Sequence, residues 1–112
     1  SILLALMSSG LNGQNFAFTG YLPINKTERN RKIKDLEILS RKIKQTQIFM
    51  ETPYRNLQLF ESILKVCSKN TQLCIATNIT LPSENIKTKT IEEWKNKKIN
   101  INKKATIFLL SS

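Results

Sequence analysis

Apolar residues recur along this chain with two periods, which together predict helices alternating with strands. A period of three to four residues begins at Asn25, a favourable capping residue with Glu28 three positions later, and continues to about Lys44. The predicted buried face of this helix consists of Ile33, Leu36, Leu39 and Ile43. An apolar run over residues 2–7 predicts the end of another helix, which Gly10 can close with a positive φ.

Capping residues predict two more helices. Thr52, followed by a proline, suits the N-cap of a helix that ends near residues 69–70. The residues expected on its buried face are Leu57, Phe60, Leu64 and Cys67. A short helix is predicted over residues 91–96, because Thr90 and Glu93 stand at the two capping-box positions. The single tryptophan of the chain is its expected apolar anchor.

Strands are predicted where apolar residues alternate with small or polar ones, or follow one another without a break. The predicted strands span residues 16–23, 46–50, 73–76, 86–88 and 105–110. In the first of them, Phe16 and Phe18 alternate with small residues, and we expect both to lie in the core. The third is a continuous apolar run, as in a strand buried on both faces. The fourth is short and polar, which suits an edge strand.

The order of these elements predicts an α/β fold, with a mixed sheet of about four to five strands flanked by helices. A length of 112 residues suits one compact domain, so we expect residues 1–112 to form a single domain. The chain begins without Met and within a helical run, and we therefore expect it to be a piece of a longer protein. The run over residues 2–7 is too short to span a membrane.

The chain is strongly basic, with eighteen Lys and Arg against eight Asp and Glu and a net charge of +10. Such a surplus favours polyanions such as RNA, whereas the alternative is a basic surface that is merely solvated. The helix that follows Asn25 carries eight of these positive charges and could contact a nucleic-acid backbone, or could equally be solvated. Its basic residues are Lys26, Arg29, Arg31, Lys32, Lys34, Arg41, Lys42 and Lys44.

Cysteine and histidine usage narrows the chemistry. The chain has no histidine, which removes Ser-His-Asp and Cys-His catalysis and most zinc sites. Cys67 and Cys74 lie in apolar runs with no zinc-site spacing, so we expect no metal and no disulfide. A reducing, cytoplasmic location fits this usage best.

Ligands of open α/β sheets bind beyond the carboxyl ends of strands, and three such ends are predicted, at residues 50–53, at 77–80 and after Leu110. Arg55 stands in the first turn of a helix, where a positive charge is unfavourable unless it meets an anion. It could instead pair with Glu51 or point into water. No pair of carboxylates suggests a general acid and base, so we predict no catalytic residue in this chain.

Two motifs resemble those of a known family. Residues 16–23, Phe-Ala-Phe-Thr-Gly-Tyr-Leu-Pro, follow a Ser-Gly-Leu at residues 9–11, and residues 51–55 read Glu-Thr-Pro-Tyr-Arg. In this order and separation they resemble the C-terminal domain of the tetrapyrrole (corrin/porphyrin) methylase superfamily. The small-subunit ribosomal RNA ribose 2′-O-methyltransferase branch is the most similar part of that superfamily. The resemblance covers nearly the whole chain.

This resemblance implies half of a two-domain, usually homodimeric methyltransferase, whose N-terminal domain is missing here. Its cofactor, S-adenosyl-L-methionine, would lie in the cleft between the domains. The cofactor-binding positions carried over by the resemblance are Met50, Glu51, Thr52, Asn78, Ile79, Lys104 and Ala105. Arg55, Tyr54 and Lys32 are the expected substrate-binding residues. The half alone is expected to be inactive.

The chain departs from the ribosomal RNA branch at two places. Tyr54 stands where that branch usually has His, and Leu81-Pro82 replaces a Lys-containing stretch expected after Thr80. Both departures leave the acceptor open between ribosomal RNA and a corrin or porphyrin. A further alternative is a basic RNA-binding module without catalysis of its own.

Overall fold

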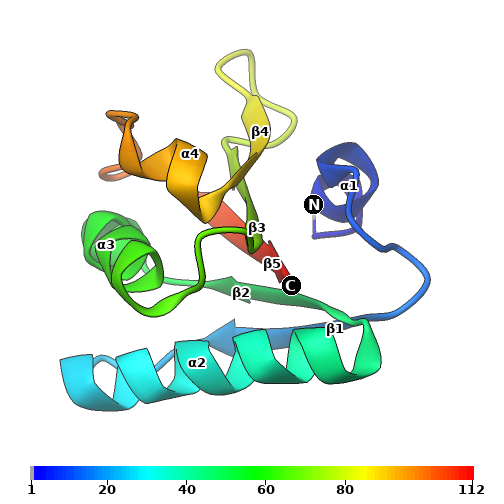
Figure 1. Cartoon of the computed structure of the whole chain (residues 1–112). Helices are drawn as coiled ribbons and strands as arrows, with labels where there is room; N and C mark the ends of the chain where they lie inside the picture. Colours follow the sequence, from blue (N-terminus) through cyan, green and yellow to red (C-terminus); the bar gives the residue numbers. More distant parts are fainter. Residues whose placement is uncertain (1) are drawn as a thin grey trace.

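The computed structural model describes residues 2–112 as a five-stranded mixed sheet with helices on both faces (Figure 1). The strands are β1 (Phe16–Tyr21), β2 (Thr46–Met50), β3 (Gln72–Thr77), β4 (Asn85–Thr90) and β5 (Thr106–Ser111). The helices are α1 (Ile2–Ser9), α2 (Lys26–Ile43), α3 (Asn56–Val66) and α4 (Ile91–Lys95). The strands lie in the order β1-β2-β5-β3-β4, and the β1–β2 pair is parallel whereas the other pairs are antiparallel. The predicted α/β fold with a mixed sheet is confirmed.

The central strands are buried on both faces because helices cover each side. Side chains of β2 and β5 alternate, so that Phe49 and Phe108 stack at 6.0 Å on the face covered by α2, α3 and α4. Ile48 and Leu109 point to the other face, where α1 covers them. The continuous apolar run in β3 has the same two-sided burial, as predicted.

Phe16 and Phe18 do not lie in the core, contrary to the prediction. They are 42% and 50% exposed. In the parallel register Phe18 lies beside Ile48, so both rings project on the face that α1 covers. However, α1 packs mainly against β4 and β5, away from the edge strand β1. It therefore leaves the β1 end of this face uncovered (Figure 1).

The buried face of α2 also differs from the prediction. Asn25 caps the helix through a 3.1 Å hydrogen bond from the Glu28 amide, as expected. Its buried residues, however, are Arg29, Ile33, Leu36, Glu37 and Ser40. Leu39 and Ile43 were predicted to be buried but are 39% and 43% exposed. The face that packs against the sheet and α3 includes polar residues that hydrogen-bond there, and apolar periodicity alone cannot identify such residues.

The buried face of α3 also differs from the prediction. Pro53–Arg55 form a turn of 3₁₀ helix, and α3 proper starts at Asn56 and ends at Val66 rather than near residues 69–70. The buried residues are Asn56, Leu59, Phe60, Ser62 and Ile63. Leu57, predicted to be buried, lies about 100° around the helix from Asn56 and is 44% exposed.

The short helix α4 agrees with the prediction. The Thr90 hydroxyl accepts from the Glu93 amide, and the Glu93 carboxylate accepts from the Thr90 amide, which completes the capping box. Trp94 is buried, and its indole N–H donates a 2.8 Å hydrogen bond to the Leu73 carbonyl. Within residues 2–112, no helix is both long and apolar enough to cross a membrane.

Candidate functional site

Three strand termini meet at one edge of the sheet. The carboxyl end of β2 pairs Met50 with Ile107, and the carboxyl end of β3 pairs Thr77 with Thr106. The start of β5 therefore lies between the ends of β2 and β3. The predicted ligand position after Leu110 was wrong, because β5 runs antiparallel to both neighbours and its carboxyl end lies at the opposite edge.

A hollow of about 250 Å³ opens at this edge, and we name it the strand-end hollow. Its lining residues are Tyr21, Met50, Glu51, Pro53, Asn78, Ile79, Leu81, Ala105, Thr106 and Ile107. Five of the seven predicted cofactor-binding positions are among them: Met50, Glu51, Asn78, Ile79 and Ala105. The other two lie beside it, Thr52 next to Glu51 and Lys104 next to Ala105.

Hydrogen bonds between loops hold this edge together. The Asn78 amide donates to the Ala105 carbonyl at 2.9 Å, and the Lys103 amide donates to the Pro53 carbonyl at 3.0 Å. Asn78 and Thr80 take positive φ values of 49° and 71°, which turn the chain sharply after β3. Three of the four segments that line the strand-end hollow are thus fixed relative to one another by their backbones, and the fourth is the end of β1 at Tyr21.

Glu51 supplies an acceptor without a partner at the hollow. It is 5% exposed, and its Oε1 accepts a 2.7 Å hydrogen bond from the Thr52 amide. The same oxygen lies 3.3 Å from Nε of Arg55 in an ion pair. Its Oε2 is buried and makes no hydrogen bond. A buried carboxylate oxygen left in this state is costly unless a ligand donates to it.

The predicted substrate-binding residues are not gathered in one place. Arg55 takes one of the alternatives considered from the sequence, an ion pair with Glu51. Tyr54, in the same 3₁₀ turn, is 75% exposed. Lys32 lies in the middle of α2 and does not line the hollow. Tyr54 and Arg55 thus stay near the strand-end hollow, whereas Lys32 belongs to another surface.

Asn56 positions one wall of the hollow and was missed in the sequence. It is fully buried, and its Nδ2 lies 3.1 Å from the Ile101 carbonyl, 2.6 Å from the Lys104 carbonyl and 3.0 Å from the Thr106 hydroxyl. It therefore fixes the loop that leads into β5. Asn56 could have been identified from the sequence as a polar residue in the first turn of a predicted helix, at a position that faces the sheet.

The strand-end hollow can hold a ligand with an apolar ring and hydroxyl donors. Met50, Ile79 and Ile107 offer apolar surface, and Glu51, whose Oε2 makes no hydrogen bond, is the one carboxylate of the lining. The adenosine part of S-adenosylmethionine has both features, a flat ring and ribose hydroxyls that donate. The residues present therefore fit this cofactor.

Comparisons with known proteins agree with this fold. No protein-family model matches the chain. It is 30% identical over 86 residues to "Ribosomal RNA small subunit methyltransferase I" of Vibrio cholerae, a match that covers 77% of this chain and 28% of that protein. The protein of the same name in Buchnera aphidicola of Schizaphis graminum is 33% identical over 78 residues, with 70% and 26% covered. The chain thus spans less than a third of the length of these relatives.

Solved structures share the fold over the whole chain at low sequence identity. The methyltransferase CobJ superposes with a TM-score of 0.64 at 12% identity, covering 100% of this chain and 47% of that protein. Uroporphyrin-III C-methyl transferase from Thermus thermophilus, solved in complex with S-adenyl homocysteine, gives a TM-score of 0.55 at 14% identity, with 98% and 48% covered. The chain is therefore a relative of the ribosomal RNA small subunit methyltransferase I proteins, within the tetrapyrrole methylase superfamily.

Proposed function

We propose that this chain is the C-terminal half of an S-adenosylmethionine-dependent methyltransferase and forms one side of its cofactor cleft. The observation that carries the proposal is the buried, unpartnered Oε2 of Glu51 beside the apolar strand-end hollow. The names of the sequence relatives and the bound S-adenyl homocysteine in one structural neighbour support the same cofactor. In this proposal a second domain completes the cleft, which is consistent with the open hollow and with the partial coverage of the relatives.

In this proposal, the residues of the chain bind and orient the cofactor and take no part in proton transfer. Bound S-adenosylmethionine supplies an activated methyl group on its sulfonium. The walls formed by Met50 and Ile79 exclude water from the adenine ring, and Glu51 accepts from the ribose hydroxyls. Methyl transfer depends largely on alignment of donor and acceptor, so a half that only positions the cofactor still contributes to the rate.

The acceptor we propose is a ribose 2′-hydroxyl of ribosomal RNA. The names of the sequence relatives support ribosomal RNA as the substrate, and so does the net charge of +10, because RNA is a polyanion. The second candidate is a corrin or porphyrin, since structural neighbours of this fold methylate such compounds by name. In that case Arg55 would meet a substrate carboxylate in place of Glu51. A homodimer in the cytoplasm is part of the proposal for the whole protein.

Isothermal calorimetry with S-adenosylmethionine tests the cofactor. We expect clear binding by the whole polypeptide that the gene encodes, and weak or no binding by residues 1–112 alone. Glu51→Gln keeps the shape of the side chain and should weaken binding by the whole polypeptide about tenfold, the effect of one charged hydrogen bond of ~1.5 kcal/mol. Glu61→Gln, on an exposed face of α3, is the matched control. No measurable binding of S-adenosylmethionine by the whole polypeptide would refute the proposal.

Incubation of the whole polypeptide with labelled S-adenosylmethionine separates the acceptors. Ribosomal small subunits and precorrin-type compounds are offered side by side. Label in the RNA supports the first candidate, and label in the tetrapyrrole supports the second.

A further inference from the structure

A second hollow, between the β3–β4 pair and the loop that joins α4 to β5, is lined by lysines. Its volume is about 330 Å³, and five of its thirteen lining residues are lysines: Lys87, Lys89, Lys97, Lys98 and Lys104. We name it the lysine hollow. The other lining residues are Ile75, Thr77, Ser83, Asn85, Trp94, Ile99, Asn100 and Ile101, so no carboxylate lines it.

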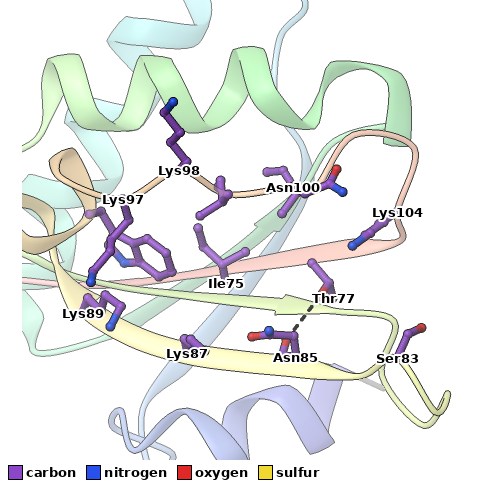
Figure 2. A pocket seen from close by; sticks show the side chains of 13 residues that line it. Ile75, Thr77, Ser83, Asn85, Lys87, Lys89, Lys97, Lys98, Asn100 and Lys104 are labelled. Atoms are coloured by element: carbon purple, nitrogen blue, oxygen red, sulfur yellow. Dashed lines mark hydrogen bonds between the residues drawn. The ribbon is translucent and has the colours of Figure 1, made fainter.

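Two segments bring the lysines together, the edge strand β4 and the single loop of residues 96–105 that joins α4 to β5 (Figure 2). Lys87 and Lys89 alternate along β4 and therefore project on the same face of that edge strand, about 6.6 Å apart along the chain. The loop between α4 and β5 adds Lys97 near its start and Lys104 near its end. Figure 2 shows Lys89 and Lys97 at one end of the hollow and Lys104 at the other.

None of the five lysines has an acidic partner. Within residues 2–112 the only ion pairs are Lys34–Glu37 and Arg55–Glu51. Lys89 and Lys97 lower the pKa of Glu93 electrostatically, but the Glu93 carboxylate is already bound in the capping box of α4. Like charges that converge without counter-charges repel one another, and a bound anion relieves this repulsion.

Trp94 forms part of the floor of the hollow and holds one of these lysines. The Lys89 ammonium lies 5.8 Å from the ring centroid of Trp94, within the range of a cation–π contact. Trp94 itself is 3% exposed, so its ring is not free to stack on a base. The hollow thus offers charge to a backbone rather than a stacking platform for bases.

The lysine hollow adjoins the strand-end hollow. Thr77 lines the lysine hollow, and its neighbour Asn78 lines the strand-end hollow. Likewise, Lys104 lines the lysine hollow and its neighbour Ala105 lines the strand-end hollow. A chain of phosphates lying in the lysine hollow would therefore pass directly beside the proposed cofactor position. A single small anion would meet one or two lysines, whereas a phosphodiester chain can meet those at both ends.

The basic helix α2 is a weaker candidate for the same role. Three of its seven basic residues are already engaged: Arg29 donates to Ser62, Lys34 pairs with Glu37, and Arg41 donates to Ser112. Of the others, Lys26 lines a hollow between α2 and α3, but that hollow also contains the carboxylate of Glu61.

We propose that the lysine hollow binds the phosphodiester backbone of single-stranded RNA next to the methylated nucleotide. This inference rests on the proposed function for the identity of that nucleotide, but the binding itself can be measured without cofactor. The contacts are to phosphates, so they give affinity without sequence preference.

The test compares two pairs of charge removals in the whole polypeptide. Lys87→Gln with Lys89→Gln removes two lysines of the hollow, and Lys65→Gln with Lys69→Gln removes two exposed lysines in and after α3. Fluorescence anisotropy measures binding of a labelled single-stranded RNA of mixed sequence between 50 and 200 mM salt (about the range over which such contacts are diagnostic). Circular dichroism checks that all variants are folded.

We expect the hollow variant to lower the slope of log K against log salt by about 1.4, which is two contacts at ~0.7 each. At 0.1 M salt this corresponds to roughly 25-fold weaker binding. The control variant should bind within about twofold of the unchanged protein, since surface charge alone acts weakly at this ionic strength. Equal losses in both variants, or none in either, would overturn the inference.

Cofactor binding distinguishes this inference from the proposed function. If the hollow variant loses RNA but binds S-adenosylmethionine normally, both stand. If RNA binding depends on the hollow while the polypeptide ignores the cofactor, the lysine hollow stands and the proposed function falls. If the cofactor binds but inorganic phosphate at millimolar concentration displaces the labelled RNA as well as unlabelled RNA does, the hollow binds a small anion. The inference then falls.

Discussion

Glu37 offers the sharpest test of how this fold is held together. Its side chain is 0% exposed, although it lies on the charged helix α2. Oε1 accepts from the Lys34 ammonium at 2.8 Å, and Oε2 accepts from the Ser68 amide at 2.7 Å and the Thr71 hydroxyl at 2.6 Å. The carboxylate therefore joins α2 to the turn between α3 and β3. Glu37→Gln preserves its size and removes its charge.

The expected loss follows from these contacts. A glutamine has one acceptor oxygen, so its NH₂ group must face either the Lys34 ammonium or the Ser68 amide, and both of these are donors. At least one charged hydrogen bond is lost and a buried donor is left without a partner. Hydrogen bonds to charged groups contribute ~1.5–3 kcal/mol, so we expect Glu37→Gln to lower the free energy of unfolding by about 3 kcal/mol.

Urea unfolding followed by circular dichroism measures this loss. With a slope of ~1.5 kcal/mol per molar urea, the midpoint should fall by roughly 2 M at pH 7. Glu61→Gln makes the same chemical change at an exposed position outside any ion pair of residues 2–112, and should change stability by less than ~0.5 kcal/mol.

The pH dependence provides an independent check. Burial of Glu37 raises the pKa of its carboxyl, but the hydrogen bonds from Lys34, Thr71 and Ser68 together outweigh burial and hold that pKa below its ordinary value of 4.5. The contribution of Glu37 is therefore complete above pH 4.5 and is lost as the pH falls through the lowered pKa. The stabilities of the unchanged chain and Glu37→Gln should converge in acid. A difference below 1 kcal/mol at pH 7 (about a third of the expected loss), or one that stays constant into acid, would refute this reasoning.

Three further predictions follow from single features. Burial, reinforced by the Glu37 carboxylate, raises the pKa of the Cys67 thiol to about 12, and burial also raises the pKa of Cys74; both thiols should resist a thiol reagent at pH 8 and react once urea unfolds the chain. Asn56→Ala removes the donor that fixes the loop before β5, so it should cost ~2 kcal/mol in urea unfolding and weaken cofactor binding by the whole polypeptide. Thr90→Ala removes the capping box of α4 and should cost ~1 kcal/mol, whereas Thr80→Ser, in an exposed turn, should not.

Strand positions were predictable because strand residues in this chain differ sharply from their surroundings. The apolar runs of β2, β3 and β5 are buried on both faces, so nearly every residue in them carries the signal. The position of β1 was also predicted correctly, but the burial of Phe16 and Phe18 was not. Their burial depends on where α1 packs. That packing joins α1 to β4, through a hydrogen bond from the Thr88 hydroxyl to the Ser9 carbonyl, across most of the chain. Local sequence contains no trace of such a contact.

Helix faces were predicted less well because polar residues form part of the interior. Arg29 was expected on the solvated side of α2, yet it is 6% exposed and donates to the Ser62 hydroxyl and the Ile24 carbonyl. Glu37 and Asn56 belong to the same class. Each is buried because a specific partner from a distant segment satisfies it, and the identity of that partner emerges only when the chain is folded.

The direction of β5 explains both the wrong prediction at the site and the hollow that the sequence did not suggest. A strand that follows a long loop can enter a sheet in either direction, and the residues of β5 are equally apolar for both. Because β5 runs antiparallel between β2 and β3, its first residues, rather than its last, meet Met50 and Thr77. The same arrangement carries Lys104 to the side of β3, where it joins Lys87 and Lys89 of β4. Reversal of this one strand would separate Ala105 from the strand-end hollow and Lys104 from the lysine hollow. Both proposed sites therefore depend on one topological feature, and their neighbouring positions are a consequence of it.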